Sequence, residues 1–176
     1  MNQRLEKAKE SIRDVIDFPK KGIVFKDITT LLKDQEHLQS LIEYISQEYM
    51  NRGITKVVGL ESRGFILGAA VAYKIGAGFV PIRKPGKLPA EVYSEKYSLE
   101  YGEDEIQIHR DALNTEDVVL LHDDLLATGG TACASLELLE RCGVKDIFCN
   151  FMVELDFLKG RDKLGSKYDV SSIFHF

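Results

Sequence analysis

The chain lacks the features that place a protein in a bilayer, outside the cell or on a nucleic acid. No apolar run in its 176 residues approaches the roughly 20 residues that span a bilayer. Its first residues, MNQRLEKAKESIRDVI, are charged and amphipathic and lack the apolar core of a secretory signal. The net charge of −5 argues against a nucleic-acid partner, which would favour a basic face. We therefore expect no membrane and no nucleic acid among its partners.

Cysteine and histidine are also few. The three cysteines are odd in number and lack CxxC spacing, which suits reduced thiols in a cytosol. The four histidines show no metal-ligand spacing. The apolar fraction of 44% is ordinary, and there is no repeat, low-complexity segment or linker. These features predict a single cytoplasmic domain over residues 1–176.

The most informative stretch is VVLLHDDLLATGGT, residues 118–131. The run VVLLH predicts a buried strand of a parallel sheet, and the acidic pair Asp123-Asp124 follows it. The small, turn-prone run ATGGT comes next, and the apolar spacing after it predicts a helix. The order is therefore strand, acidic pair, glycine loop and helix.

A glycine loop that leads into a helix suits a phosphate. Gly129 and Gly130 let the backbone approach a ligand, and the first helical turn leaves N–H groups unpaired. Those donors, with the hydroxyls of Thr128 and Thr131, can bind a phosphate dianion. The acidic pair would repel a phosphate and is better placed to accept hydrogen bonds from ribose hydroxyls. The stretch predicts a sugar-phosphate site; the plain alternative is a strand end, a solvated turn and a helix cap.

Two familiar nucleotide loops do not fit this stretch. No Lys follows the glycines, as it would in a Walker loop, and there is no GxGxxG fingerprint.

Strand and helix patterns alternate along the rest of the chain. Apolar spacing predicts helices over residues 5–17, 38–49 and 66–73. Apolar runs predict strands over residues 55–60, 79–83, 118–122, 146–154 and 170–176. Residues 97–101 and 105–109 alternate about a Gly-Glu-Asp turn and predict a hairpin. This order predicts an α/β fold with a central, mostly parallel sheet flanked by helices, and ligands then bind at the carboxyl ends of its strands.

Three segments between these elements read as irregular. Pro19 and Gly22 end the first helix, and Ile23-Val24-Phe25 form a short apolar hook. Residues 84–95, KPGKLPAEVYSE, are long, basic and irregular, which is typical of a loop that carries function. Residues 155–164 read as a loop with a short helix.

Six motifs occur in a single order: DFPKKGIVFKDIT, GLESRGF, FVPIRKPGKLP, YSLEYG, DDLLATGGT and VELDFLKGR. With them the chain resembles the type I phosphoribosyltransferases over nearly its whole length. The first, fourth and last motifs narrow the resemblance to the adenine phosphoribosyltransferase family. The resemblance implies the type I phosphoribosyltransferase fold, with an N-terminal hood over residues 1–34 and a flexible lid over residues 84–100.

The resemblance also implies a reaction. Adenine and 5-phosphoribosyl 1-diphosphate would give AMP and diphosphate, with inversion at ribose C1′. Mg²⁺ would be bound through the diphosphate and water, without direct protein ligands, and the assembly would be a homodimer.

The family pattern implies a role for each matching residue of the phosphoribosyl diphosphate site. The 5′-phosphate would be bound by Ala127, Thr128, Gly129, Gly130 and Thr131. The ribose hydroxyls would be bound by Asp123 and Asp124. The pyrophosphate loop would be Glu61, Ser62 and Arg63, with a cis peptide bond between the first two. Further pyrophosphate contacts would come from Arg83, Lys84 and Lys87, some of them across the dimer. Arg63 could instead form a surface ion pair, and the two lysines could be a solvated face.

The hook would bind adenine. The backbone at Val24 would read the adenine edge, and Phe25 and Leu155 would sandwich the ring, although both could also be plain core. A 6-oxo purine presents the opposite hydrogen-bonding pattern and would be rejected. Lys26 stands beside the base where the family usually has Arg, so the bidentate contact is lost.

Glu100 and Tyr101 lie at the far end of the lid and are the remaining catalytic candidates beside Arg63. Glu100 would accept the N9 proton or steady the ring; it could also be an exposed strand residue, and Tyr101 could pack in the hairpin. His122 stands where the family usually has an apolar residue. We expect it to be a strand-end residue with a local hydrogen bond and no catalytic role.

Two other functions compete with this interpretation. One is transfer to a different purine or pyrimidine. The other is a regulatory module that binds phosphoribosyl diphosphate without turnover; such regulators usually carry a DNA-binding domain or a basic face, and this sequence has neither.

Overall fold

A computed structural model describes residues 3–99 and 102–176. The chain divides into two compact units, one up to Glu48 and one from Tyr49 onward, and each is described by itself. No helix among the described residues has both the length and the apolar character that a membrane span requires.

The first unit contains helices α1 (Gln3–Glu10), α2 (Thr29–Leu32) and most of α3 (Gln35–Tyr49), with strands β1 (Arg13–Ile16) and β2 (Val24–Asp27). The predicted first helix is therefore too long. It ends at Glu10, and the Ser11 hydroxyl donates to the carbonyl of Ala8 at 2.7 Å. The residues that follow pair antiparallel with β2, because the chain doubles back through the turn before it.

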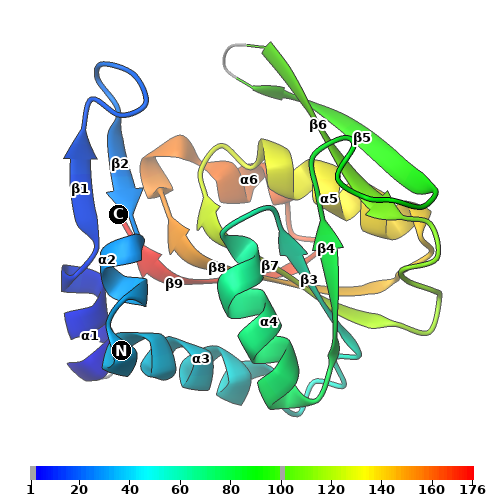
Figure 1. Cartoon of the computed structure of the whole chain (residues 1–176), viewed down its shortest axis with the longest axis horizontal. Helices are drawn as coiled ribbons and strands as arrows, with labels where there is room; N and C mark the ends of the chain where they lie inside the picture. The colour runs from blue at the N-terminus through cyan, green and yellow to red at the C-terminus, as the bar shows by residue number, and fades with distance from the viewer. Residues whose placement is uncertain (1–2, 100–101) are drawn as a thin grey trace. The chain divides into compact units, whose positions relative to one another are not determined.

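The second unit is built on a five-stranded parallel sheet with the order β4-β3-β7-β8-β9 (Figure 1). Its strands are β3 (Lys56–Leu60), β4 (Gly78–Ile82), β7 (Val118–Leu126), β8 (Asp146–Glu154) and β9 (Asp169–His175). Its helices are α4 (Gly64–Ile75), α5 (Gly130–Arg141) and α6 (Gly160–Leu164), with a 3₁₀ turn η1 (Asp156–Leu158). The predicted α/β fold with a central, mostly parallel sheet is confirmed.

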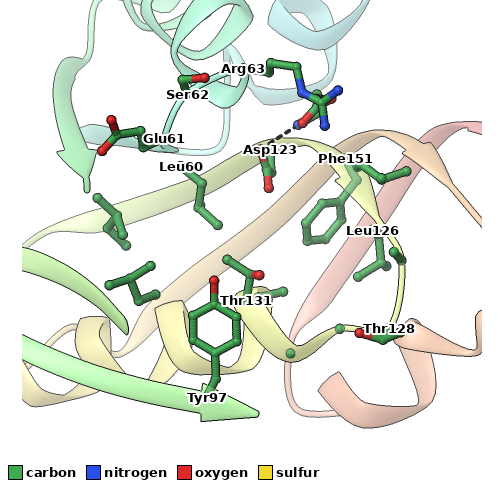
Figure 2. Close-up of a pocket in the computed structure, with 18 of the residues that line it drawn as sticks. Leu60, Glu61, Ser62, Arg63, Tyr97, Asp123, Leu126, Thr128, Thr131 and Phe151 are labelled. Carbon is green, nitrogen blue, oxygen red and sulfur yellow. Dashed lines mark hydrogen bonds and ion pairs between the residues drawn. The ribbon is translucent and has the colours of Figure 1, made fainter. Parts of the chain in front are cut away.

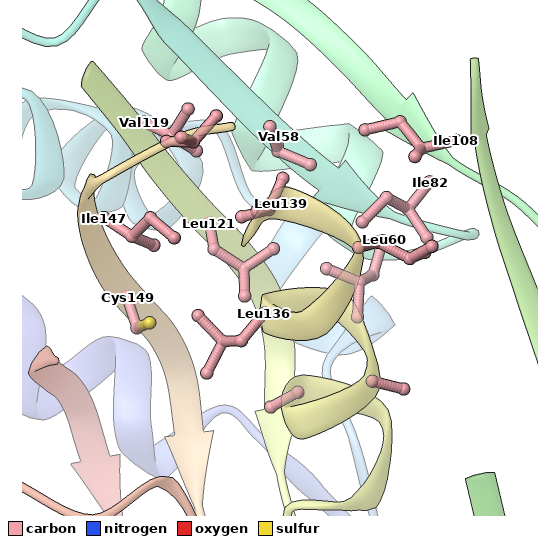
Figure 3. Packing of buried hydrophobic residues seen from close by; sticks show 14 of the residues in the cluster. Val58, Leu60, Ile82, Ile108, Val119, Leu121, Leu136, Leu139, Ile147 and Cys149 are labelled. Carbon is pink, nitrogen blue, oxygen red and sulfur yellow. The ribbon is translucent and has the colours of Figure 1, made fainter. Parts of the chain in front are cut away.

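Helices cover both faces of this sheet, which explains why its strands are apolar without alternation. Leu136 and Leu139 of α5 pack against Leu121, together with Val58 and Leu60 of the neighbouring strand (Figure 3). On the other face, α4 approaches so closely that a β-carbon on its Gly68 would lie 3.2 Å from the Phe79 ring. Burial of both faces fixes the strands and so the position of their carboxyl ends.

Two elements are longer than predicted. Strand β7 continues to Leu126 because its backbone stays paired with β8 up to the Leu126–Glu154 pair. The acidic pair therefore lies inside the strand. The hairpin consists of β5 (Val92–Leu99) and β6 (Gly102–His109), so the irregular loop is shorter than residues 84–95. Much of the predicted lid is thus strand, and whether it moves stays a prediction.

Candidate active site

A cleft opens at the carboxyl ends of β3 and β7, where the order of the strands reverses. Strand β4 pairs with one edge of β3, and β7 pairs with the other edge. The chain segments that follow β3 and β7 therefore leave the sheet in opposite directions, and a crevice opens between them. Figure 2 shows Glu61, Ser62 and Arg63 on one side of the cleft and Thr128 and Thr131 on the other. The fold thus brings together three segments that the sequence analysis had assigned to one ligand.

The acidic pair forms the floor between these two sides. Asp124 is buried and forms an ion pair with Arg63, whose Nε lies 3.0 Å from its Oδ2. Burial, and next the Asp124 carboxylate, raise the pKa of Asp123 well above its usual value. Burial also raises the pKa of Asp124, against the opposing effect of Arg63. Two adjacent carboxyls that resist a second negative charge are suited to accept hydrogen bonds from hydroxyl groups.

The turn after β3 packs directly onto β7. A β-carbon on Gly64 would lie 2.8 Å from the carbonyl oxygen of His122 and 2.9 Å from Oδ1 of Asp123. Only glycine therefore allows this approach. The peptide bond between Glu61 and Ser62 is cis, as predicted.

Glu61 joins this turn to the end of β4. Its carboxylate accepts from Arg83 Nη2 at 3.0 Å and Nε at 3.2 Å, and from the backbone N–H of Lys84 at 2.9 Å. The hydrogen bonds from Arg83 are the main reason that the pKa of Glu61 is lowered. Arg83 and the exposed Lys87 do not contribute to the cleft lining that the structure describes.

Lys84 reaches the cleft from the same strand end. Its Nζ contacts the carboxylate of Asp104 and lies 3.0 Å from the hydroxyl of Tyr97, and Tyr97 donates to Asp104 at 3.1 Å. Burial disfavours its charge, but the hydrogen bonds to Asp104 and Tyr97 prevail and raise the pKa of Lys84. Sequence reasoning missed Tyr97 and Asp104, although Tyr97 belongs to the quoted YSLEYG motif. Their meeting with Lys84 depends on hairpin pairing, which spacing alone does not reveal.

The glycine loop enters α5 at the opposite side of the cleft. Gly129 precedes the helix with φ +79, a left-handed conformation that favours glycine. The run from Ala127 to Thr131 lines the cleft, so the first turn of α5 opens onto it. This is the arrangement in which unpaired N–H groups bind a phosphate.

His122 lies in the middle of β7, so its expected place at a strand end is wrong. The expected local hydrogen bond is confirmed, because its Nδ1 lies 3.0 Å from Oδ1 of Asn150 on β8. Burial lowers the pKa of His122 to about 4. The side chain is therefore neutral near pH 7 and part of the core.

The residues predicted to bind adenine are divided between the two units. Val24 is exposed on β2, Phe25 contacts the edge of Phe18 with ring centroids 5.2 Å apart, and Lys26 pairs with Asp14 at 2.7 Å. Leu155 follows β8 in the second unit, and its N–H donates to Leu126 at 3.0 Å. The predicted sandwich of adenine stays a prediction. The two lid candidates, Glu100 and Tyr101, lie outside the described residues.

Comparisons with known proteins agree on one family. The family model described as the phosphoribosyl transferase domain matches residues 27–174. A relative from Phocaeicola vulgatus named adenine phosphoribosyltransferase is 58% identical over 156 residues, which cover 89% of this chain and 90% of that protein. The chain belongs to the adenine phosphoribosyltransferase family. The predicted family and its class of enzyme, a pentosyltransferase, are confirmed.

Solved structures of this family have the same fold. The adenine phosphoribosyltransferase of Thermoanaerobacter pseudethanolicus has a TM-score of 0.94 at 49% identity, and the match covers 98% of this chain and 99% of that chain. The Giardia lamblia enzyme, crystallised with 9-deazaadenine, has a TM-score of 0.95 at 43% identity, with 99% of each chain covered. The type I phosphoribosyltransferase fold expected from the motifs is therefore confirmed.

Proposed function

We propose that this cleft transfers the phosphoribosyl group of 5-phosphoribosyl 1-diphosphate to adenine, which releases diphosphate and forms AMP in purine salvage. The observation that carries the proposal is the convergence of a glycine loop at a helix start, an acidic pair and a cationic turn at one strand-order reversal. The names of the relatives support adenine as the acceptor.

The sugar phosphate binds on the α5 side. Backbone N–H groups of the run 127–131 and the hydroxyls of Thr128 and Thr131 hold the 5′-phosphate at the positive end of the helix. Asp123 and Asp124 accept hydrogen bonds from the ribose 2′- and 3′-hydroxyls. Their raised pKa values favour neutral hydroxyl partners over a second anion.

The diphosphate leaves toward the β3 side. Arg63 is in the cleft with its charge shared by Asp124, and Lys84 is in the cleft with its charge shared by Asp104. Both can turn their charge to the departing oxygens and so stabilise the negative charge that develops on them. Arg83 and Lys87 extend this cationic side beyond the cleft lining.

Mg²⁺ suits this cleft as a partner of the substrate. Carboxylate oxygens of Glu61, Asp123 and Asp124 line the cleft, and oxygen is the ligand that Mg²⁺ prefers. Glu61 is already bound to Arg83 and Asp124 to Arg63, so these groups fit an ion held chiefly by diphosphate and water. When bound there, Mg²⁺ would neutralise charge on the diphosphate oxygens.

Adenine binds through the N-terminal hook. The backbone at Val24 accepts from the 6-amino group and donates to N1, and Phe25 and Leu155 contact the two faces of the ring. Lys26 places a positive charge near the base. Its ammonium group makes a single contact, where the guanidinium group of Arg would make a bidentate one. N9 then attacks C1′ from the face opposite the diphosphate, so the configuration inverts through a transition state with oxocarbenium character.

Glu100 and Tyr101, which follow β5 in the sequence, complete the proposed site. Glu100 accepts the N9 proton or stabilises the sugar cation, and closure of the segment 84–100 excludes water that would hydrolyse it. The enzyme acts as a homodimer in the cytoplasm. Sedimentation of the purified chain tests the assembly, and a dimer of identical chains is the expected result.

The decisive experiment is an assay of diphosphate release. Adenine should give AMP and diphosphate only when both phosphoribosyl diphosphate and Mg²⁺ are present. Hypoxanthine, guanine and xanthine should compete poorly, because a 6-oxo group leaves the hook's hydrogen bonds unpaired. Preference for one of these bases would identify a different phosphoribosyltransferase. Binding of phosphoribosyl diphosphate without turnover of any base would identify a regulatory module instead.

A further inference from the structure

The VELDFLKGR motif contains more than the proposed adenine contact of Leu155. It runs from the end of β8 through η1 into α6, and Glu154, Gly160 and Arg161 have no role in the proposed reaction. All three lie in the second unit, beside the loop proposed to bind the 5′-phosphate.

Gly160 and Gly129 pack backbone against backbone. A β-carbon on Gly160 would lie 2.2 Å from the carbonyl oxygen of Ala127 and 3.0 Å from the nitrogen of Gly129. A β-carbon on Gly129 would in turn lie 2.6 Å from the carbonyl oxygen of Gly160. Neither segment can accept a side chain here. The start of α6 is therefore in direct contact with the phosphate loop.

Arg161 fixes the start of α6 to two strands. Its Nε and Nη2 donate to the two carboxylate oxygens of Glu154 at 3.0 and 2.5 Å, a bidentate pair. Its Nη1 also donates to the carbonyl of Val170 at 2.6 Å, and its Nη2 to the hydroxyl of Ser172 at 3.2 Å. The Ser172 hydroxyl donates to Glu154 at 2.5 Å. Glu154 is buried, whereas the Arg161 side chain is 39% exposed, so the carboxylate end of the cluster is the part shielded from water.

The anchor of this cluster lies at the entrance of the phosphate loop. Glu154 is the strand partner of Leu126, the residue directly before Ala127. On the far side of the loop, the thiol of Cys133 in the first turns of α5 lies 3.7 Å from the carbonyl oxygen of Lys163 in α6. The loop is thus held at its entrance by β8 and along its length by α6.

We propose that Gly160 and the Arg161–Glu154 pair are positioning residues for the 5′-phosphate site. A site made largely of backbone N–H groups cannot correct its geometry by turning side chains, so its affinity depends on what supports the loop. The start of α6 supplies that support. This inference rests on the proposed function, because it names what positions the phosphate loop of that same cleft.

The test compares variants for each half of the substrate separately. Gly160→Ala should raise the KM for phosphoribosyl diphosphate and the Kd for ribose 5-phosphate at least about tenfold, because the loop must move away from the new methyl group. The Kd for Mg²⁺–pyrophosphate and the KM for adenine should stay within about twofold, because those groups bind elsewhere. Arg161→Gln should likewise weaken the binding of phosphoribosyl diphosphate and ribose 5-phosphate and leave the constants for pyrophosphate and adenine unchanged. Arg161→Lys should restore part of the affinity for ribose 5-phosphate.

Lys163→Gln is the matched control, because it removes one positive charge from the exposed face of the same helix. It should leave every constant unchanged. Circular dichroism and melting curves check that each variant is folded; if Gly160→Ala does not fold, the two Arg161 variants decide. Equal losses for ribose 5-phosphate and pyrophosphate, or unchanged ribose 5-phosphate binding in folded variants, would overturn the inference. A wild-type protein that is inactive but still binds ribose 5-phosphate would refute the proposed function. The inference would then still be decided by comparing how the variants bind ribose 5-phosphate and pyrophosphate.

Discussion

The two sides of the cleft are built by different means. The α5 side consists of backbone: Gly129 in a left-handed conformation and pressed against Gly160. The β3 side consists of long charged side chains that are already paired, Arg63 with Asp124 and Lys84 with Asp104. The first side is fixed before any ligand arrives. On the second side, the proposed binding of diphosphate would require each cation to exchange one anionic partner for another.

This difference matches what each side would hold. The 5′-phosphate stays on the product throughout the reaction, so a rigid backbone site is sufficient. The diphosphate is bound, separated from the sugar and released, and cations with alternative protein partners can release it without being left unpaired in a partly buried cleft.

The largest expected effect comes from breaking the rigid side. Gly129→Ala should lower kcat/KM for phosphoribosyl diphosphate about a hundredfold, because its β-carbon would lie 2.6 Å from the Gly160 carbonyl oxygen and would displace the loop. Gly76→Ala is the control, since Gly76 has a similar φ of +76 but no atom within 4 Å of the added carbon. Steady-state kinetics of both variants separate backbone strain from loop displacement. Equal effects in the two would mean that the loop is not held by α6.

The next effect concerns the floor that both sides share. Asp124→Asn should lower kcat about tenfold or more, because it removes the anionic partner of Arg63 and weakens the proposed contact to the ribose hydroxyl. Turnover of adenine at saturating substrate is the measurement. Asp117→Asn, which changes a buried aspartate paired with Lys56 at the other end of β3, should cost stability but not kcat once the protein is folded. Wild-type turnover by the Asp124 variant would remove the proposed ribose role.

A smaller effect tests the exchange of partners on the β3 side. Asp104→Asn should tighten the Kd for Mg²⁺–pyrophosphate about threefold, because a partly exposed ion pair to Lys84 no longer has to be given up. The Kd for ribose 5-phosphate should not change. Glu105→Gln serves as the control. It also removes one negative charge, at the next residue of the same strand, but the Glu105 carboxylate accepts a hydrogen bond from Gln107. Weaker pyrophosphate binding in the Asp104 variant would show that Asp104 positions Lys84 for the ligand.

The sequence predicted the phosphate loop on the α5 side better than it predicted the paired cations on the β3 side. The phosphate loop is local: strand, glycines and helix follow one another within residues 118–131, so spacing alone indicates a phosphate site. Strand β8 was predicted at its observed bounds because burial on both faces makes it largely apolar, with Asn150 as the polar residue between Ile147 and Val153. Strand β7 was cut short because Asp123 and Asp124 interrupt its apolar pattern, although backbone pairing with β8 continues.

Contacts between distant segments were beyond the reach of such patterns. The positions Leu5, Ile12, Val15 and Ile16 fit one helical face, yet pairing with β2 turns the last two into strand. Likewise, the partners of Lys84 come from the hairpin, and the support of Gly129 comes from Gly160. The family resemblance supplied residue roles, but it did not indicate which cations are already paired within the chain.

The smallest effect on activity, and a distinct effect on stability, is expected at His122, which is buried in β7 next to the acidic pair. Its carbonyl faces Gly64, the first residue of α4, and its ring lies beside Gly68 of the same helix. Its folded pKa of about 4 lies below the ordinary 6.5, so its contribution is complete above pH 6.5 and is lost as the pH falls toward 4. The unfolded chain takes up the proton first, and the full loss would be about 3 kcal/mol.

His122→Val should flatten the decline in unfolding free energy between pH 6.5 and pH 4, whatever its stability at pH 7, while kcat at pH 7.5 changes less than about twofold. Urea unfolding at several pH values measures the slope. If the slope of the His122 variant equals that of the wild type, the acid sensitivity arises elsewhere in the chain. A large loss of kcat would mean that packing of this buried side chain in β7 also sets the geometry of the cleft.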